Sequence, residues 1–188
     1  MNRTKFLTAF ACVILSITPT LARSKSKRDH SEVEFFQSLS IGSKDIVISI
    51  PNSYELVHHD IIGRKQTIGF VPDNSNMSNW NRYIGIHIEL NTSSSAGENI
   101  TQLQRYLKKT YPGAKVLDSN ITRLPNGVQE ASTTVLFKDE TGDVIMNAAY
   151  FSDNSKIIGS EISQRVTKSV KRAKSSAERL AGQVIRLR

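Results

Sequence analysis

Short stretches of alternating apolar and polar residues, separated by turn residues, make up most of this chain. The clearest is residues 83–90, in which Ile84, Ile86, Ile88 and Leu90 would share one face. Alternation with a period of two is typical of a β-strand that buries one face. Similar stretches, bounded by turn signals, predict strands at residues 45–50, 54–60, 66–71, 115–124, 128–138, 143–152 and 156–162. The sequence therefore predicts an α+β protein with a mostly antiparallel sheet.

Helical periodicity appears in two longer segments. Between residues 99 and 111, apolar residues recur at the spacing of one helix face, with Asn99 as the expected N-cap and Pro112 just after the end. From Val166 to the C-terminus, the apolar residues repeat at alternating spacings of four and three, namely Val166, Val170, Ala173, Ala177, Leu180, Val184 and Leu187. This spacing predicts one long C-terminal helix that covers the sheet.

The first 22 residues have the pattern of a cleavable export signal. Arg3 and Lys5 precede an apolar run over residues 6–17, and small residues lead to an expected cleavage after Ala22. The run is shorter than the roughly 20 apolar residues that a membrane-spanning helix needs. We therefore expect residues 1–22 to be a signal peptide and the mature protein to be exported, to the periplasm or the secreted fraction.

Two further segments complete the expected organisation. Residues 23–40 would form a flexible basic leader and a short helix, which begins at the capping-box pair Ser31 and Glu34 and runs through Leu39. Residues 41–188 would form a single domain. Cys12 is the only cysteine, so cleavage leaves none. The absence of cysteine excludes both a thiol nucleophile and a cysteine-ligated zinc site in the mature chain.

Charge is unevenly distributed along the chain, whose formal net charge is +8. Residues 165–188 hold eight basic residues against the single acid Glu178, and residues 23–30 hold four against Asp29. Residues 31–164 hold eleven basic and fifteen acidic residues. The protein is therefore a mildly acidic body with two basic ends, of which the first is the short leader and the second is the terminal helix.

Two motifs and the order of the elements resemble a known superfamily. The first motif is Ile50-Pro51-Asn52-Ser53-Tyr54-Glu55-Leu56, and the second combines Phe70-Val71-Pro72, a polar loop, Trp80 and Ile84-Gly85-Ile86-His87-Ile88. With the order helix, strands, helix, strands, helix, they resemble the α/β/α sandwich of the PsbP, Mog1 and DcrB superfamily. The resemblance implies a sheet flanked by helices, a non-enzymatic, adaptor-like role and a place in the bacterial envelope.

One cluster offers the residue types that bind transition metals. His58 and Asp60 would share one face of a strand, whereas His59 would point to the other face, and His87 is the remaining candidate for a third ligand. The alternatives are a small-ligand or metal-binding module, or a minor hydrolase, around His58, Asp60 and His87, and merely polar residues at a strand end. The sequence contains no P-loop, G-x-G-x-x-G, H-E-x-x-H or G-x-S-x-G, which favours a non-enzymatic protein without a cofactor.

The terminal helix and one loop supply the expected interaction residues. The basic side chains around the apolar stripe include Lys168, Lys171, Arg172, Lys174 and Arg179, and the loop at residues 72–81 adds Trp80. Such a helix either presents a solvated basic face or docks on an acidic protein, an anionic lipid surface or nucleic acid. The basic stretch lacks aromatic residues, which argues against nucleic acid and weakens the membrane hypothesis. We expect a protein partner, and the sequence leaves the oligomeric state open.

Overall fold

The structure, a computed structural model, describes residues 33–125 and 127–188. The expected export signal, the leader and Ser31 of the capping box lie outside these residues. In chain order, the elements are β1 (Val33–Ile41), β2 (Lys44–Pro51), β3 (Tyr54–Ile62), β4 (Lys65–Pro72), β5 (Arg82–Leu90), α1 (Ala96–Thr110), β6 (Lys115–Arg123), β7 (Gln129–Asp139), β8 (Gly142–Ser152), β9 (Lys156–Arg165), α2 (Val170–Val184) and β10 (Ile185–Leu187). Every strand that the alternation predicted is present.

The strands form two antiparallel sheets. Seven of them make one sheet in the order β3-β4-β5-β9-β8-β7-β6, and the other three make a small sheet in the order β1-β2-β10. Every pair of neighbouring strands runs antiparallel. The predicted α+β class with an antiparallel sheet is therefore confirmed.

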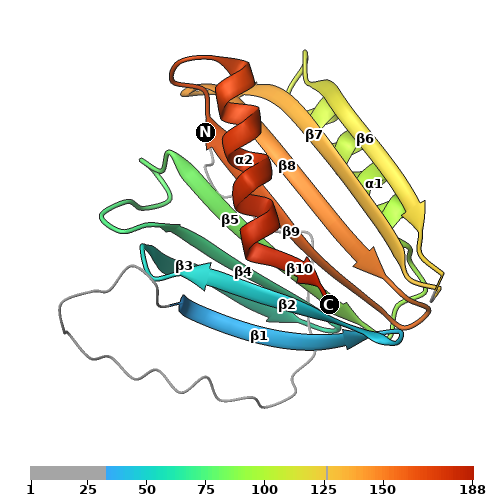
Figure 1. Cartoon of the computed structure of the whole chain (residues 1–188). Coiled ribbons are helices and arrows are strands. Elements are labelled where there is room, and N and C mark those ends of the chain that lie inside the picture. The colour runs from blue at the N-terminus through green and yellow to red at the C-terminus, as the bar shows by residue number, and fades with distance from the viewer. Residues whose placement is uncertain (1–32, 126) are drawn as a thin grey trace.

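Helices cover both faces of the seven-stranded sheet, as Figure 1 shows. On one face, α2 lies across β8 and β9, and the small sheet packs beside it. The main core fills this layer and includes Ile48, Phe70, Ile86 and Ile158. On the other face, α1 packs against β6, β7 and β8 and closes two smaller apolar clusters. The result is the α/β/α arrangement that the resemblance implied.

Strand β1 replaces the short helix predicted through Leu39, and that prediction was wrong. Side-chain exposure alternates along the segment: Phe35 and Leu39 are half-buried, whereas Phe36 and Ser38 are exposed. This is the period of a strand, and β1 pairs with β2 along nearly its whole length. The tertiary pairing with β2 outweighs the local helix signal.

The terminal helix is shorter than predicted, since it does not run from Val166 to the end of the chain. It begins after the N-cap Ser169 and ends at Val184, and the last residues pair with β2 as strand β10. Its apolar stripe is buried as expected, at Ala173, Ala177, Leu180 and Val184. Ile185 and Leu187 take part in the sheet because the alternation of apolar residues there fits an edge of β2.

Helix α1 begins earlier than expected, so Asn99 is not its N-cap. Ser95 takes that position, where its hydroxyl accepts from the Glu98 amide at 3.2 Å and its own amide donates to the Glu98 carboxylate at 2.7 Å. This reciprocal pair satisfies two amides that a helix start leaves open. In the described part of the chain, no helix combines the length and the apolar character needed to cross a bilayer.

Candidate functional site

The predicted metal ligands lie on one face of the seven-stranded sheet, but they do not come together. His58 and Asp60 share a face of β3, as predicted, and form an ion pair with 3.3 Å between Nε2 and Oδ2. His87 lies on β5, two strands away, because Asp60 is opposite Thr67 on β4 and Thr67 is opposite His87. At about 4.8 Å per strand, the two backbones are about 10 Å apart. Among the described residues, no three metal-ligating side chains form a metal-sized group.

His87 belongs instead to a cluster on the central strands β5, β8 and β9. Its Nε2 lies 3.4 Å from Oε2 of Glu161, and Oε1 of Glu161 accepts a hydrogen bond from the hydroxyl of Tyr150. The rings of His87 and Tyr150 are 6.1 Å apart between centroids. The side chains of His87 and Glu161 are only 27% and 15% exposed, so the pair is largely shielded from water. We call His87, Tyr150 and Glu161 the central cluster.

Glycines make room for the central cluster. Gly159 is opposite His87 on one side and Tyr150 on the other, and the Tyr150 ring lies flat over it. Gly85 is covered in the same way by the side chains of Tyr83 and His87. A residue with a Cβ at these positions would meet the rings, so the glycines allow large side chains to lie down on the sheet.

The charges of the central cluster stabilise one another. Burial alone would lower the pKa of His87, but the adjacent Glu161 carboxylate outweighs that effect and raises it. Burial would raise the pKa of Glu161, whereas His87 and the Tyr150 hydroxyl hold it below its usual value. Burial, with the neighbouring Glu161, raises the pKa of Tyr150 well above the usual value. These shifts favour the charged forms of His87 and Glu161 and the neutral form of Tyr150.

A histidine, a glutamate and a tyrosine are groups that move protons in enzymes. In the central cluster they are each other's polar partners, which suits a structural network at the centre of the sheet. Sequence reasoning singled out His87 but missed Glu161 and Tyr150. The glycines that interrupt the strands at Gly85 and Gly159 are the signal that could have indicated close packing there.

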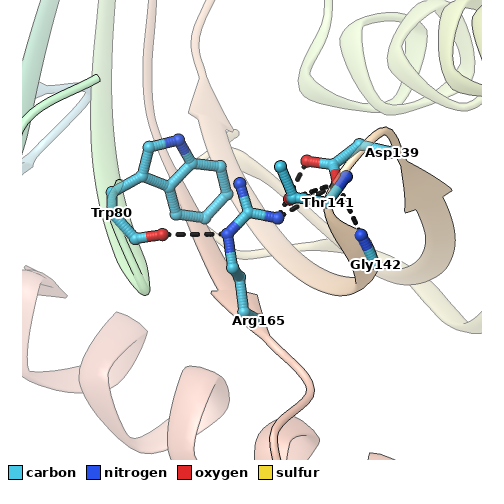
Figure 2. A network of polar contacts seen from close by, with 5 residues as sticks. All are labelled: Trp80, Asp139, Thr141, Gly142 and Arg165. Carbon is cyan, nitrogen blue, oxygen red and sulfur yellow. Dashed lines mark hydrogen bonds and ion pairs between the residues drawn. The ribbon is translucent and has the colours of Figure 1, made fainter. Parts of the chain in front are cut away.

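Trp80 lies at one end of the same sheet face, where it forms part of a clamp with Arg165 (Figure 2). The guanidinium carbon of Arg165 lies 4.3 Å from the centroid of the indole ring, and Nε of Arg165 donates to the Trp80 carbonyl at 2.9 Å. Nη1 of Arg165 donates to both carboxylate oxygens of Asp139 at 3.0 Å. Trp80 is half-buried and also packs on Tyr83. These contacts give Trp80 a structural role, joining its loop to β9 and to the β7–β8 turn.

The turn at Asp139 holds that carboxylate in place for Arg165. The Asp139 carboxylate accepts hydrogen bonds from the amide of Thr141 at 2.7 Å and from the amide of Gly142 at 3.1 Å, in addition to those from Arg165. Burial would raise the pKa of Asp139, but the hydrogen bonds from Thr141 and the Arg165 guanidinium lower it. Arg165 therefore belongs to the fold, although the sequence grouped it with the basic residues of the terminal helix.

The other basic residues of that group do lie at the surface. Lys168, Lys171, Arg172 and Arg179 are exposed on or just before α2. Lys174 is half-buried and forms ion pairs with Asp118 at 3.7 Å and with Glu178 at 3.4 Å. We call the exposed set Lys168, Lys171, Arg172 and Arg179 the basic face of α2.

Comparison with known proteins gives a fold and no family. No protein-family model matches the chain, and no curated protein matches it either. Among solved structures, the solution structure of cyanobacterial PsbP (CyanoP) from Synechocystis sp. PCC 6803 matches with a TM-score of 0.51 and 12% sequence identity, over 87% of this chain and 99% of that one. The chain therefore has a PsbP-like fold, as the sequence motifs and element order indicated.

Proposed function

We propose that this chain is an exported, non-enzymatic accessory domain that binds an acidic protein partner through the basic face of α2. The proposal depends on one observation above all. One side of α2 is buried against the sheet through Ala173, Ala177 and Leu180. The opposite side presents Lys171, Arg172 and Arg179 to solvent, and the exposed Lys168 lies just before the helix. A fixed helix that carries like charges on its outer side is a preorganised docking surface.

The charged groups of this face form no ion pairs among the residues that the structure describes, so they can bind an acidic partner. Within the described part of the chain, no carboxylate lies within 4 Å of the charged groups of Lys168, Lys171, Arg172 or Arg179. Like charges that face water repel one another, and an acidic surface would relieve that repulsion while steering association. A protein surface with several carboxylates, spaced along about three turns of helix, is the complement.

Two further observations support an accessory role. The PsbP-like fold agrees with the adaptor-like role that the sequence resemblance implied. The groups best suited to acid–base chemistry, His87 and Glu161, lie 3.4 Å apart, and Glu161 also accepts a hydrogen bond from Tyr150. These contacts fit a domain whose polar interior holds the sheet together while its surface does the binding.

Export is supported by the sequence pattern of residues 1–22. The test is N-terminal sequencing of the protein recovered from its own organism, together with cell fractionation. We expect the mature chain to begin at Arg23 and to be found outside the cytoplasm. Recovery from the cytosol with Met1 intact would contradict the export part of the proposal and leave the binding part to its own test.

The binding part is tested by charge reversal on α2 against a matched reversal elsewhere. The full chain, immobilised, captures partners from an envelope extract of its organism, and the variant Lys171→Glu/Arg172→Glu is compared with Lys108→Glu/Lys109→Glu. Both pairs are adjacent, basic and exposed, but the control pair lies at the end of α1. We expect one discrete protein to be retained by the wild type and the α1 variant and lost by the α2 variant.

Salt and lipid controls separate this proposal from its competitors. Exposed charges are screened beyond about 10 Å at 0.1 M salt, so retention should weaken as salt rises. Equal loss in both charge-reversal variants would show nonspecific electrostatic capture. Another outcome is that the chain binds vesicles of anionic lipid with the same dependence on Lys171 and Arg172 and captures no protein. That result would show that the partner of α2 is a membrane surface and not a protein. Measured turnover of any substrate class would overturn the non-enzymatic role.

A further inference from the structure

Among the described strands, β6 forms one edge of the seven-stranded sheet and pairs with β7 alone. All of its nine residues are exposed except Val116, which is half-buried. Figure 1 shows it as the outermost strand on the side away from β3. An edge strand of this length presents backbone N–H and C=O groups on its free side, which can pair with another extended chain.

The two faces beside this edge differ in chemistry. On the α2 side, a groove of about 310 Å³ lies between the helix and strands β6, β7 and β8. Three carboxylates line it, those of Asp118, Glu130 and Glu178, together with hydroxyl and amide groups such as Thr134 and Asn147. Lys174 forms ion pairs with both Asp118 and Glu178, so one positive charge offsets part of the negative charge of the groove, which stays acidic. A hydrogen bond of 3.1 Å from Asn147 to Thr134 continues the polar surface across the sheet.

On the α1 side, the same strand presents the apolar side chain of Ile121, which is 54% exposed. Leu117, which is 40% exposed, lies at the bulge of β6 between Val116 and Asp118. Ile121 lies close to Gly97 at the start of α1, so it is positioned by the helix on one side and open on the other. Isolated exposed apolar residues are common, but Ile121 on one face, an acidic groove on the other and Leu117 at the bulge together define an amphipathic edge.

We propose that β6 is a docking edge for an extended segment of a protein partner in which basic and apolar residues alternate. The segment would pair its backbone with β6 and continue the sheet. Because side chains of a strand point alternately to its two faces, its basic residues would lie toward the acidic groove, and its apolar residues toward Ile121. This surface is separate from the basic face of α2 and does not depend on it.

Charge complementarity selects this occupant over a second copy of the chain. In an antiparallel pairing of two β6 strands, the register that sets Leu117 opposite Ile121 also sets Lys115 opposite Arg123, at both ends of the contact. Like charges directly opposite one another destabilise a strand pair. A basic and apolar segment meets carboxylates instead.

The test uses a synthetic peptide with capped ends, in which lysine and valine alternate over nine residues. Its affinity for the full chain is measured by fluorescence polarisation, and its site is mapped from backbone amide chemical shifts. We expect saturable binding, with the shifts concentrated between Lys115 and Arg123. A peptide with glutamate in place of lysine, and one with alternate backbone amides N-methylated so that they cannot donate to the edge, should both bind at least about tenfold more weakly.

Matched variants of the two sheet edges sharpen the test. Ile121→Lys introduces a charge on β6, a device by which natural edge strands avoid pairing, and Leu56→Lys does the same on β3, where the residue is 50% exposed. Glu130→Gln removes a carboxylate with little change of shape and serves if Ile121→Lys disturbs folding. We expect Ile121→Lys and Glu130→Gln to weaken the peptide at least about threefold and Leu56→Lys to leave it unchanged.

Several results would overturn this proposal. One is the absence of saturable peptide binding, and another is an equal loss of affinity in Leu56→Lys. A third is a set of chemical-shift changes centred on α2. The last is a concentration-dependent dimer that Ile121→Lys disperses, because such a dimer would assign the edge to a second copy of the chain. Lys171→Glu/Arg172→Glu should not weaken binding of the peptide. The β6 proposal can therefore fail while the α2 proposal holds, and the α2 proposal can fail while the β6 proposal holds.

Discussion

Replacing Gly159 by alanine tests the packing of the central cluster. A Cβ at this position would lie 2.6 Å from Cε1 of Tyr150, closer than real Cβ contacts. The ring cannot easily move aside, since Tyr150 is 5% exposed and its hydroxyl is bound by Glu161. The substitution must therefore displace a buried ring or bend two strands.

The size of the effect follows from two opposing contributions. Forcing an extra carbon into a packed site costs about 1–3 kcal/mol. The loss of glycine's freedom in the unfolded chain returns about 0.4–1 kcal/mol. We expect Gly159→Ala to lower the free energy of unfolding by about 1–2 kcal/mol, or the melting temperature by about 2–8 °C for a domain of this size.

Two other glycines serve as controls in the same assay, which is urea unfolding with the slope checked for constancy. At Gly182, near the end of α2, an added Cβ would meet no other atom within 4 Å, so Gly182→Ala should raise stability by up to about 1 kcal/mol through helix propensity. Gly85 is intermediate, since the nearest contacts of an added Cβ would be at 3.2 and 3.3 Å. The stability order should be Gly182→Ala above Gly85→Ala above Gly159→Ala. A Gly159→Ala variant as stable as the wild type would refute the packing of Tyr150 over the sheet.

Three further substitutions test other parts of the fold. Arg165→Gln should lower the free energy of unfolding by about 2 kcal/mol, because hydrogen bonds to charged groups contribute about 1.5–3 kcal/mol. The same substitution should shift the fluorescence emission of Trp80, and unchanged emission would contradict the clamp. The pKa of His87, followed by NMR, should lie above its usual value of about 6.5. Because that pKa is raised, the wild type should be more stable than His87→Gln by the full amount below about pH 6.5, and this difference in the free energy of unfolding should disappear as pH rises through the raised pKa. The contribution of Glu161 is lost in the other direction, as pH falls through its lowered pKa. A difference in stability that does not change with pH would contradict the pair. Ser95→Ala should cost about 0.5–2 kcal/mol in thermal unfolding, and no loss would remove its role as N-cap.

Local periodicity was sufficient for most of the fold. The strands from β2 to β9 and the helix α1 each carry a residue pattern bounded by turn residues within the segment itself, so neighbouring residues were enough to predict them. The stripe of α2 was equally plain, and Ala173, Ala177, Leu180 and Val184 are indeed buried. The element order then matched a PsbP-like fold, although sequence identity to the solved PsbP structure is only 12%.

The two segments that were predicted as helix but form strands have a common physical origin. The segment of β1 carries a helix-start pattern, and the last residues of the chain continue the spacing of α2, so the local signals favoured helix in both places. Both segments instead pair with β2, the central strand of the small sheet. Partners far away in sequence decide such edges, and a single sequence does not show which strand a segment will meet.

The candidate site was predictable only where its residues are neighbours in sequence. His58 and Asp60 share a face because they are two positions apart on a strand, and the structure pairs them. Bringing Glu161 to His87 depends on the register between β5 and β9, which no local pattern specifies. The proposed metal set failed to gather for the same reason, since Asp60 and His87 lie on strands separated by β4.

The most direct test of the proposed function is photo-crosslinking in living cells, with a photoreactive residue placed at Lys171 of the full chain and, as control, at Lys108. We predict a discrete adduct with one protein from Lys171 and none from Lys108. The same adduct from both positions, or no protein adduct from Lys171, would contradict the claim that the basic face of α2 binds a protein partner.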